Sequence, residues 1–293
     1  MDKGGPSWTA LNAAVQRAIH QLAADEPKIV TDPVVVPLVE AAAPGKIAAG
    51  MEARNLMAKG GRATTLIHRH RFAEDELARV VMEGVRQYVV LGAGLDTFAY
   101  RQPPFADALE IIEVDHPATQ AWKRASLAAA GIPLPSNLSW APVDFQCDTL
   151  SDRLSSAGFD SSRPACFSWL GVTQYLTLPA IDDTLRFVAG LPSPSTLVLT
   201  FVVPTSMIPP EQHEAMKQLL QMAAAAGEPF LTFFDPAELR ARLHELGFSR
   251  VVHLSPTEAN TRYFAGRRDG LQALAGLGKT PTPVRLGSTG GAG

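Results

Sequence analysis

The sequence lacks the features of a secreted or membrane-spanning protein. It contains only two cysteines, Cys147 and Cys166, and neither belongs to a CxxC pair. We expect both to be reduced and to act as small core residues, which suits the cytoplasm. No apolar run reaches the roughly 18 residues that span a membrane, and the first residues lack the apolar core of a signal peptide. A cytoplasmic protein without a membrane partner is therefore expected.

An excess of charge of one sign is also missing. The 26 lysines and arginines are balanced by 29 aspartates and glutamates, which gives a net charge of −3. Because no basic stripe is available to neutralise phosphates, nucleic acid is not expected as a partner. The seven histidines show neither an HExxH motif nor paired Cys/His spacing, so no metal site is predicted. The chain does have enough apolar residues for one large core, 46% of 293.

The most informative stretch joins an apolar run to a glycine turn. Residues 88–97 read Tyr-Val-Val-Leu-Gly-Ala-Gly-Leu-Asp-Thr, and residues 111–115 read Ile-Ile-Glu-Val-Asp. A buried strand, a Gly-x-Gly turn, a helix and an acidic residue at the end of the next strand form the nucleoside site of doubly wound folds. Gly92 and Gly94 allow a tight turn and a close approach to a ligand. Asp115 lies 21 residues after Gly94, where it can accept hydrogen bonds from ribose hydroxyls.

The residues after the glycines indicate which nucleoside is bound. A dinucleotide fingerprint needs Gly or Ala three positions after the second glycine, but that position is Thr97. Asp96 lies where a pyrophosphate would run, and a carboxylate there is electrostatically unfavourable. It suits a cationic ligand instead, such as the sulfonium and ammonium groups of S-adenosylmethionine. We therefore predict S-adenosylmethionine rather than NAD, and an NAD-dependent oxidoreductase is disfavoured.

Strand and helix patterns alternate from residue 88 onward. Apolar runs predict strands at 88–91, 109–114, 138–143, 165–170 and 196–203, with helices at 117–130, 149–157 and 179–189 between them. This alternation predicts an α/β fold, a mostly parallel Rossmann-like sheet with helices on both faces. Residues 250–254 and 262–265 are expected to add an antiparallel hairpin at the C-terminal edge.

Three regions are expected along the chain. Residues 1–85 form a helical N-terminal cap, with helices at 9–24 and 73–83 separated by a Pro-, Gly- and Ala-rich loop at 27–61. Residues 86–275 form the core domain. Its segment at about 204–236 is too long for a simple connection, so its helix at 213–226 is expected to form a lid. The Gly- and Pro-rich residues 276–293 are expected to be a flexible tail.

The glycine motif resembles the signature of the leucine carboxyl methyltransferase family, in particular its bacterial branch of small-molecule O-methyltransferases. The resemblance extends from about residue 7 to residue 271. Its landmarks are Val90-Leu-Gly-Ala-Gly-Leu-Asp-Thr-Phe-Ala-Tyr-Arg101, Arg69-His-Arg71, Glu113-Val-Asp-His-Pro117, Pro142-Val-Asp-Phe145, Leu170-Gly-Val-Thr-Gln-Tyr-Leu176, Phe233-Phe-Asp-Pro236, Leu246-Gly-Phe248 and Arg262-Tyr-Phe264. It implies the class I methyltransferase fold and S-adenosylmethionine as methyl donor, with S-adenosylhomocysteine as product.

The resemblance also implies roles for residues outside the glycine turn. Asp144 and Phe145 are expected to contact adenine, through the exocyclic amine and the ring; a helix cap is the alternative for Asp144. Arg69 resembles the arginine that binds the cofactor carboxylate, which a guanidinium does with two parallel hydrogen bonds. Arg71 is close enough to be confused with it. Relatives usually carry Glu where this chain has Leu170, so part of the ammonium contact is expected to pass to Asp96, a backbone carbonyl or water.

The expected activity is methyl transfer to a carboxylate or hydroxyl of a small molecule in secondary metabolism. A carboxylate acceptor is already ionised at neutral pH, whereas a hydroxyl requires a base. The candidates for an acceptor-site or base residue are Tyr175, His213 and His116, and Tyr175 has packing as its alternative role. Because Leu170 departs from the family pattern, a cofactor-binding protein with lost or altered catalysis is the alternative function. No motif indicates the acceptor or the oligomeric state.

Overall fold

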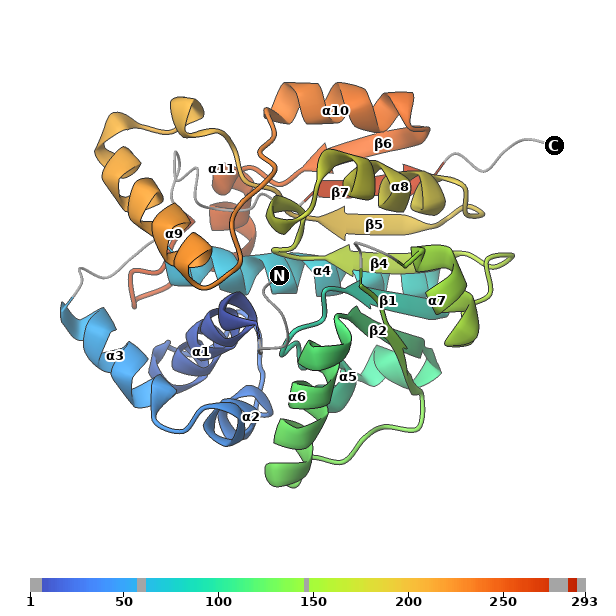
Figure 1. Cartoon of the computed structure of the whole chain (residues 1–293). Coiled ribbons are helices and arrows are strands. Elements are labelled where there is room, and N and C mark those ends of the chain that lie inside the picture. Colours follow the sequence, from blue (N-terminus) through green and yellow to red (C-terminus); the bar gives the residue numbers. More distant parts are fainter. Residues whose placement is uncertain (1–6, 57–61, 145–147, 274–283, 289–293) are drawn as a thin grey trace.

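A seven-stranded sheet forms the centre of the protein (Figure 1). The computed structural model describes residues 7–56, 62–144, 148–273 and 284–288. The strand order is β3-β2-β1-β4-β5-β7-β6. Only β7 runs in the opposite direction to the other six strands. The strands are β1 (Gln87–Leu91), β2 (Glu110–Asp115), β3 (Leu138–Pro142), β4 (Ala165–Trp169), β5 (Thr196–Leu199), β6 (Phe248–His253) and β7 (Val284–Ser288).

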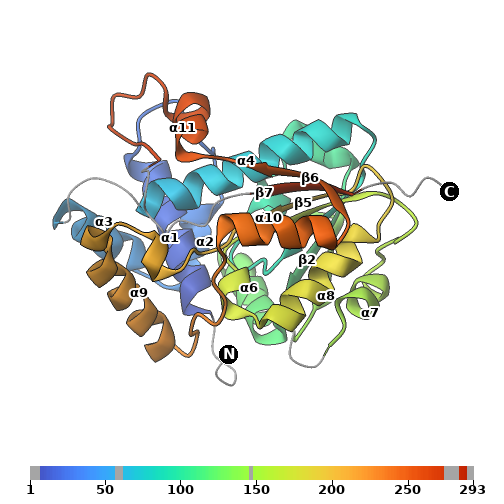
Figure 2. The ribbon, with the colours of Figure 1, turned by 90° about the horizontal axis from the view of Figure 1, so that it is seen from above.

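Helices cover both faces of this sheet because its central strands are buried on both sides. All five residues of β1 are buried: Val89 and Leu91 pack on one face, Tyr88 and Val90 on the other. The first face is covered by α7 (Leu150–Ser156), α8 (Leu178–Ala189) and α10 (Pro236–Glu245), and the second by α4 (Arg62–Met82) and α5 (Phe98–Arg101). Figure 2 shows α4 on one side of the sheet and α7, α8 and α10 on the other. The predicted α/β fold is confirmed.

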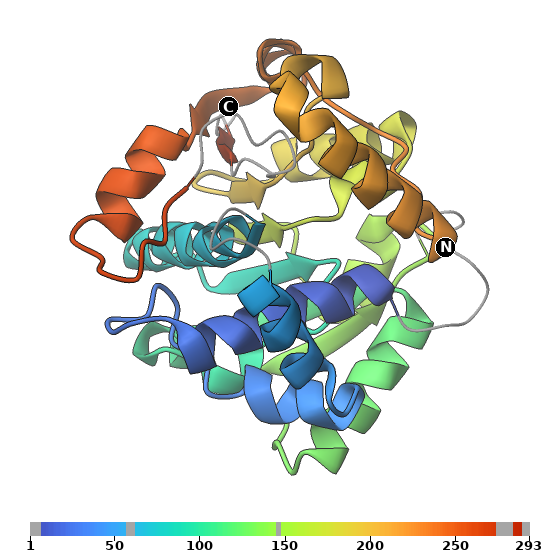
Figure 3. The same cartoon turned by 90° about the vertical axis from the view of Figure 1, so that its left-hand side faces the viewer.

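Two helices from distant parts of the chain lie near the carboxyl ends of the parallel strands. They are α1 (Trp8–Ala23) and α9 (His213–Ala225), seen from that side in Figure 3. Helix α1 packs on α2 (Val35–Ala42), α3 (Lys46–Leu56) and α4, while α6 (Pro117–Ala129) contacts β3 and α2. No helix within the described ranges is both long enough and apolar enough to cross a membrane.

The C-terminal edge differs from the predicted hairpin. Residues 262–265 do not form a strand: the short helix α11 (Pro256–Ala259) leads into a π-helical turn, Asn260–Phe264. A capping box between Ser255 and Glu258 starts this helix, and the Tyr263 hydroxyl donates to Asp75 of α4 at 2.9 Å. The strand that pairs with β6 is β7, and it inserts between β5 and β6.

Two further expectations need correction. The predicted loop at 27–61 contains α2 and α3, whose Ala- and Val-rich sequences form helices against α1. Part of the expected flexible tail, residues 284–288, is strand β7; residues 276–283 and 289–293 lie outside the described residues. Cys166 is a buried, free cysteine as expected, and Cys147 lies outside the described residues.

Candidate functional site

The register of the sheet brings several predicted site residues to one edge. Leu91, the last residue of β1, pairs with Val114 of β2 and Trp169 of β4. The segments that follow these three strands therefore begin at the same level of the sheet. They contain the glycine turn, Asp115 and the loop that begins at Leu170. In an open α/β sheet, this carboxyl edge is where ligands bind.

Both glycines of the turn are required by the local geometry. Gly92 and Gly94 have positive φ angles of 67° and 47°, which side chains with a Cβ rarely adopt. A Cβ on Gly92 would lie 2.2 Å from Val172 Cγ2, and one on Gly94 would lie 2.9 Å from Ala10 Cβ. The start of α1 and the loop after β4 thus lie directly against the turn.

Asp115 is bound to the glycine turn. Its Oδ2 accepts a hydrogen bond from the Gly94 N–H at 2.5 Å, and its Oδ1 accepts one from the His116 N–H at 2.7 Å. Burial raises the pKa of Asp115, and these two backbone donors oppose that rise. Each carboxylate oxygen can accept a further hydrogen bond, so the residue can hold the turn and still bind ribose hydroxyls.

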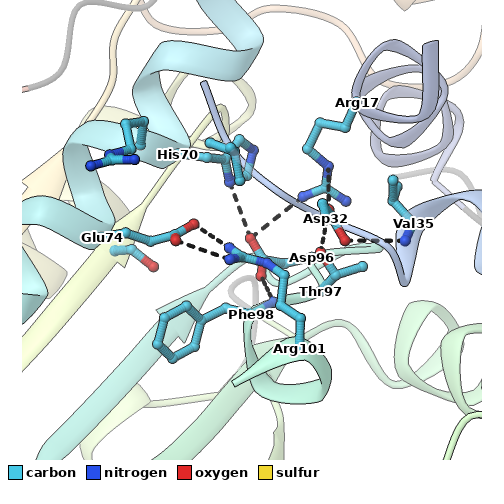
Figure 4. Close-up of polar contacts among 12 residues, drawn as sticks. Arg17, Asp32, Val35, His70, Glu74, Asp96, Thr97, Phe98 and Arg101 are labelled. Atoms are coloured by element: carbon cyan, nitrogen blue, oxygen red, sulfur yellow. Dashed lines mark hydrogen bonds and ion pairs between the residues drawn. The ribbon is translucent and has the colours of Figure 1, made fainter. Parts of the chain in front are cut away.

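Asp96 has protein partners, which the sequence did not reveal (Figure 4). Its Oδ2 lies 3.7 Å from Arg17 Nη1 of α1 and 3.3 Å from His70 Nδ1 of α4, and its Oδ1 accepts from the Phe98 N–H at 2.8 Å. Burial acts to raise the pKa of Asp96, but the hydrogen bond from His70 and the charge of Arg17 outweigh it, and this pKa lies well below its usual range. Burial lowers the pKa of His70 to about 4. Asp96 is therefore ionised and paired with Arg17, a cation that it shares with Asp32. Its expected contact with the cofactor ammonium stays a prediction.

The rest of this polar network joins the cap to the core. Arg17 also donates to the Leu95 carbonyl at 2.5 Å and lies 4.0 Å from Asp32 Oδ2, which accepts from the Thr97 hydroxyl at 2.6 Å. A second pair, Glu74 of α4 with Arg101 of α5, lies beside it (Figure 4). Arg17 and Asp32 come from the N-terminal region and surround the turn after β1. No spacing in the sequence indicates this partnership.

Arg69 is a buried cation with no anionic partner among the described residues. Its side chain is on α4 and is 5% exposed, and its Nε has no hydrogen-bond partner. Burial, with a smaller contribution from Arg17, lowers the pKa of Arg69 to about 10. A Cβ on Gly171, which has a φ of 76°, would lie 2.7 Å from Arg69 Nη1. The absence of a side chain at Gly171 thus leaves room for the Arg69 guanidinium, which has no counter-ion among the described residues. Arg71, in contrast, pairs with Asp75 at 2.8 Å on the helix surface.

Leu170 packs in a core cluster. It is partly buried against an apolar cluster that includes Ile67 and Phe72 of α4 and Val198 of β5. Its expected contact with the cofactor stays a prediction.

Asp144 follows β3, and its backbone N–H donates to Asp148 Oδ2 at 2.9 Å. It is not a helix cap, because α7 is capped at Thr149. Phe145 lies outside the described residues.

Two of the three candidates for the acceptor site, His116 and Tyr175, are not placed as bases, whereas His213 must donate through Nε2 to a carbonyl and so keeps Nδ1 without the proton. His116 caps α6, its Nδ1 accepting from the Ala118 N–H at 3.2 Å. His213 begins α9, with its Nε2 3.0 Å from the Ile208 carbonyl oxygen. Burial raises the pKa of Tyr175, so its hydroxyl stays protonated at neutral pH. The Tyr175 ring packs edge-to-face on Phe230, with 5.2 Å between ring centroids.

Among the described residues, no group of three or more His, Cys, Asp or Glu side chains could hold a metal ion.

We expect Leu170→Glu to destabilise the protein. A carboxylate placed in the apolar cluster loses water without gaining a partner, so the free energy of unfolding should fall by about 2 kcal/mol. Urea denaturation measures this change, and Leu170→Met, which keeps a similar volume, should lose less than about 1.5 kcal/mol. Unchanged stability together with tighter S-adenosylmethionine binding would instead show that the side chain faces the cofactor.

Comparison with known proteins agrees with this fold. The family model described as "Leucine carboxyl methyltransferase" matches residues 10–189. The Bacillus subtilis (strain 168) protein named "Putative S-adenosyl-L-methionine-dependent methyltransferase YktD" is 34% identical over 214 residues, which cover 72% of this chain and 69% of that one. A Mycobacterium tuberculosis (strain ATCC 25177 / H37Ra) protein with the name "Putative S-adenosyl-L-methionine-dependent methyltransferase" is 28% identical over 279 residues, 92% of this chain and 74% of its own length.

A solved structure shares the fold. The crystal structure titled as that of a "putative methyltransferase" from Thermobifida fusca YX has a TM-score of 0.56 and 18% sequence identity, and covers 98% of this chain and 97% of that one. The sheet order, the glycine turn and this likeness define an S-adenosylmethionine-dependent methyltransferase of class I fold. Within that class, the chain belongs to the leucine carboxyl methyltransferase family.

Proposed function

We propose that this methyltransferase transfers a methyl group to an oxygen atom of a small molecule in secondary metabolism, and that the oxygen belongs to a carboxylate. The cofactor supplies an electrophilic methyl group, so the protein must align the acceptor and exclude water. The family's printed description, which concerns carboxyl methylation, supports an oxygen acceptor. The same description supports a carboxylate over a hydroxyl, and so does the state of Tyr175 and His116.

A hydroxyl acceptor would require a group that removes its proton. His116 Nδ1 accepts a backbone N–H, so the other nitrogen of that ring carries the proton, and Tyr175 is itself protonated. His213 donates through Nε2 to a backbone carbonyl, so its Nδ1 is the one nitrogen of these candidates that is placed to take a proton. A carboxylate needs no such group at neutral pH.

Next to Tyr175, the rings of Phe230 and Phe233 form an aromatic wall, that is, a group of neighbouring aromatic rings, with 6.2 Å between the Phe230 and Phe233 centroids. This wall suits the apolar body of a small organic acid.

The cofactor site that we propose combines the residues gathered at the carboxyl edge. Arg69 fits the cofactor carboxylate because it is buried and has no counter-ion in the described part of the chain. Gly92 and Gly94 allow the ligand to approach the backbone, and Asp115 has acceptor capacity left for ribose. We keep Asp144 and Phe145 as adenine contacts, because they follow the next strand of the same edge.

A screen of matched acids and alcohols tests the proposed function. The enzyme is incubated with S-adenosylmethionine and pairs of small aromatic molecules that differ only in carrying a carboxylate or a hydroxyl. We expect methyl esters, which are detected by mass spectrometry and hydrolysed by mild alkali. Alkali-stable methyl ethers alone would assign hydroxyl acceptors instead. Cofactor binding without transfer to any acceptor in the screen would favour the alternative, a binding protein with lost or altered catalysis.

Replacing Asp115 by alanine should weaken S-adenosylhomocysteine binding about 10- to 150-fold. This range corresponds to the roughly 1.5–3 kcal/mol of hydrogen bonds to a charged group. Titration calorimetry measures the affinity. Asp107→Ala removes an exposed carboxylate on the turn before β2 and should leave the affinity unchanged. An Asp115→Ala affinity within a factor of two of the wild type would remove Asp115 from the site.

A further inference from the structure

We propose that Glu228, in the segment that follows α9, binds the ammonium group at the amino-acid end of S-adenosylmethionine. The inference rests on the cofactor placement proposed above, in which Arg69 binds the carboxylate of the same end. The amino-acid end of the cofactor carries a negative and a positive charge a few ångströms apart. A complete site therefore needs one anion beside the lone Arg69 cation.

Glu228 is a buried carboxylate held next to the glycine turn by α1. Its side chain is 7% exposed, and its Oε2 accepts a hydrogen bond from the Thr9 N–H at 2.9 Å. Thr9 belongs to the first turn of α1, and the next residue, Ala10, is the one that lies against Gly94. Two residues of one helical turn thus connect Glu228 to the glycine loop, although Thr9 and Glu228 are 219 positions apart in the sequence.

Tyr175 connects Glu228 to Arg69. The negative charge of Glu228 raises the pKa of the Tyr175 hydroxyl and the positive charge of Arg69 lowers it, so both charges lie close to this side chain. Backbone hydrogen bonds fix the segment after Glu228 beside it: the Leu231 N–H donates to the Gln174 carbonyl at 2.7 Å. Arg69 and Glu228 therefore both lie near Tyr175, at the edge of the sheet where the glycine turn lies.

One oxygen of Glu228 has no partner among the described residues, whereas both oxygens of the other candidate anion, Asp96, already have protein partners. Within the described residues, the Glu228 carboxylate has one polar contact, the hydrogen bond that Oε2 accepts from the Thr9 N–H, and Oε1 has none. Asp96 is already paired with Arg17 and hydrogen-bonded to His70 and Phe98. Leu170 offers an apolar side chain that packs in the core. Arg69 and Glu228 together match the charges of an α-amino acid.

Two ligands that differ in the amino-acid end test this assignment. S-adenosylhomocysteine carries that end, and 5′-methylthioadenosine lacks it. Glu228→Gln removes the charge but keeps an oxygen for the Thr9 N–H, so the contact with the first turn of α1 is retained. We expect this variant to bind S-adenosylhomocysteine about 10- to 150-fold more weakly, with 5′-methylthioadenosine affinity within a factor of two. Glu214→Gln, an exposed carboxylate on α9, should change neither affinity.

The other outcomes separate the possible failures. An equal loss for both ligands would show that Glu228 acts only by placing α1, and would overturn the assignment. Unchanged affinity for both would overturn it as well. If the wild-type protein bound neither ligand, the cofactor placement itself would fail, and this inference with it. No acceptor is present in the titrations, so their outcome does not depend on whether a carboxylate or a hydroxyl is methylated.

Discussion

Replacing Gly94 by valine should weaken S-adenosylhomocysteine binding by more than about 100-fold while leaving a folded protein. The branched side chain would oppose the positive φ of 47° at this position. It would also begin 2.9 Å from Ala10 Cβ, so α1 and the glycine turn would have to separate. The hydrogen bond from the Gly94 N–H to Asp115 would then be disturbed, and with it the proposed ribose contact.

A second glycine provides a control for backbone strain. Gly131 has a φ of 67°, but a Cβ on it would meet nothing within 4 Å. Gly131→Val should therefore lose stability through its backbone and keep its cofactor affinity. Titration calorimetry gives the affinities, and circular dichroism confirms that each variant is folded. Normal affinity in Gly94→Val would mean that the turn has only a structural role.

The largest expected effect on stability comes from Arg17. Replacing it by methionine should lower the free energy of unfolding by about 3–5 kcal/mol, the usual cost of leaving buried charges without their partner. The change removes the cation near both Asp96 and Asp32, and the donor to the Leu95 carbonyl. Its side chain is 6% exposed, so solvent cannot replace these interactions.

An exposed arginine supplies the matched control for this variant. Arg186 pairs with Asp183 at 2.8 Å, but its side chain is 59% exposed, and Arg186→Met should cost less than about 1 kcal/mol. Urea denaturation without ligand measures both variants. Adding Asp96→Asn to Arg17→Met should recover part of the loss, because one unpaired charge disappears. A loss below 1 kcal/mol in Arg17→Met would show that the network contributes little to stability.

The central sheet could be predicted from the sequence because its signals are local. A run such as residues 87–91 is buried on both faces and therefore consists almost entirely of apolar residues. The glycine turn and Asp115 also follow from short spacings, and the register of three neighbouring strands brings them together. In contrast, β7 is five residues long and contains a glycine, so its sequence alone does not distinguish it from a loop.

The partners of the site residues could not be predicted, because they are set by long-range packing. Asp96 is a plausible ligand for a cation when only its motif is considered. Arg17, which pairs with it, comes from α1. Glu228 carried no motif that would have separated it from the other acidic residues between positions 204 and 236. Only the fold places it beside Thr9 and Tyr175.

The position of β7 has a consequence for how the chain folds during synthesis. It is the last strand of the described residues, yet it lies between β5 and β6 and pairs with both. Until residues 284–288 leave the ribosome, β5 and β6 each present an open edge, and such edges can pair with other chains. The sheet is therefore completed from its interior, and only after β6 has been synthesised. A carboxyl-terminal fusion must leave this strand free to enter the gap.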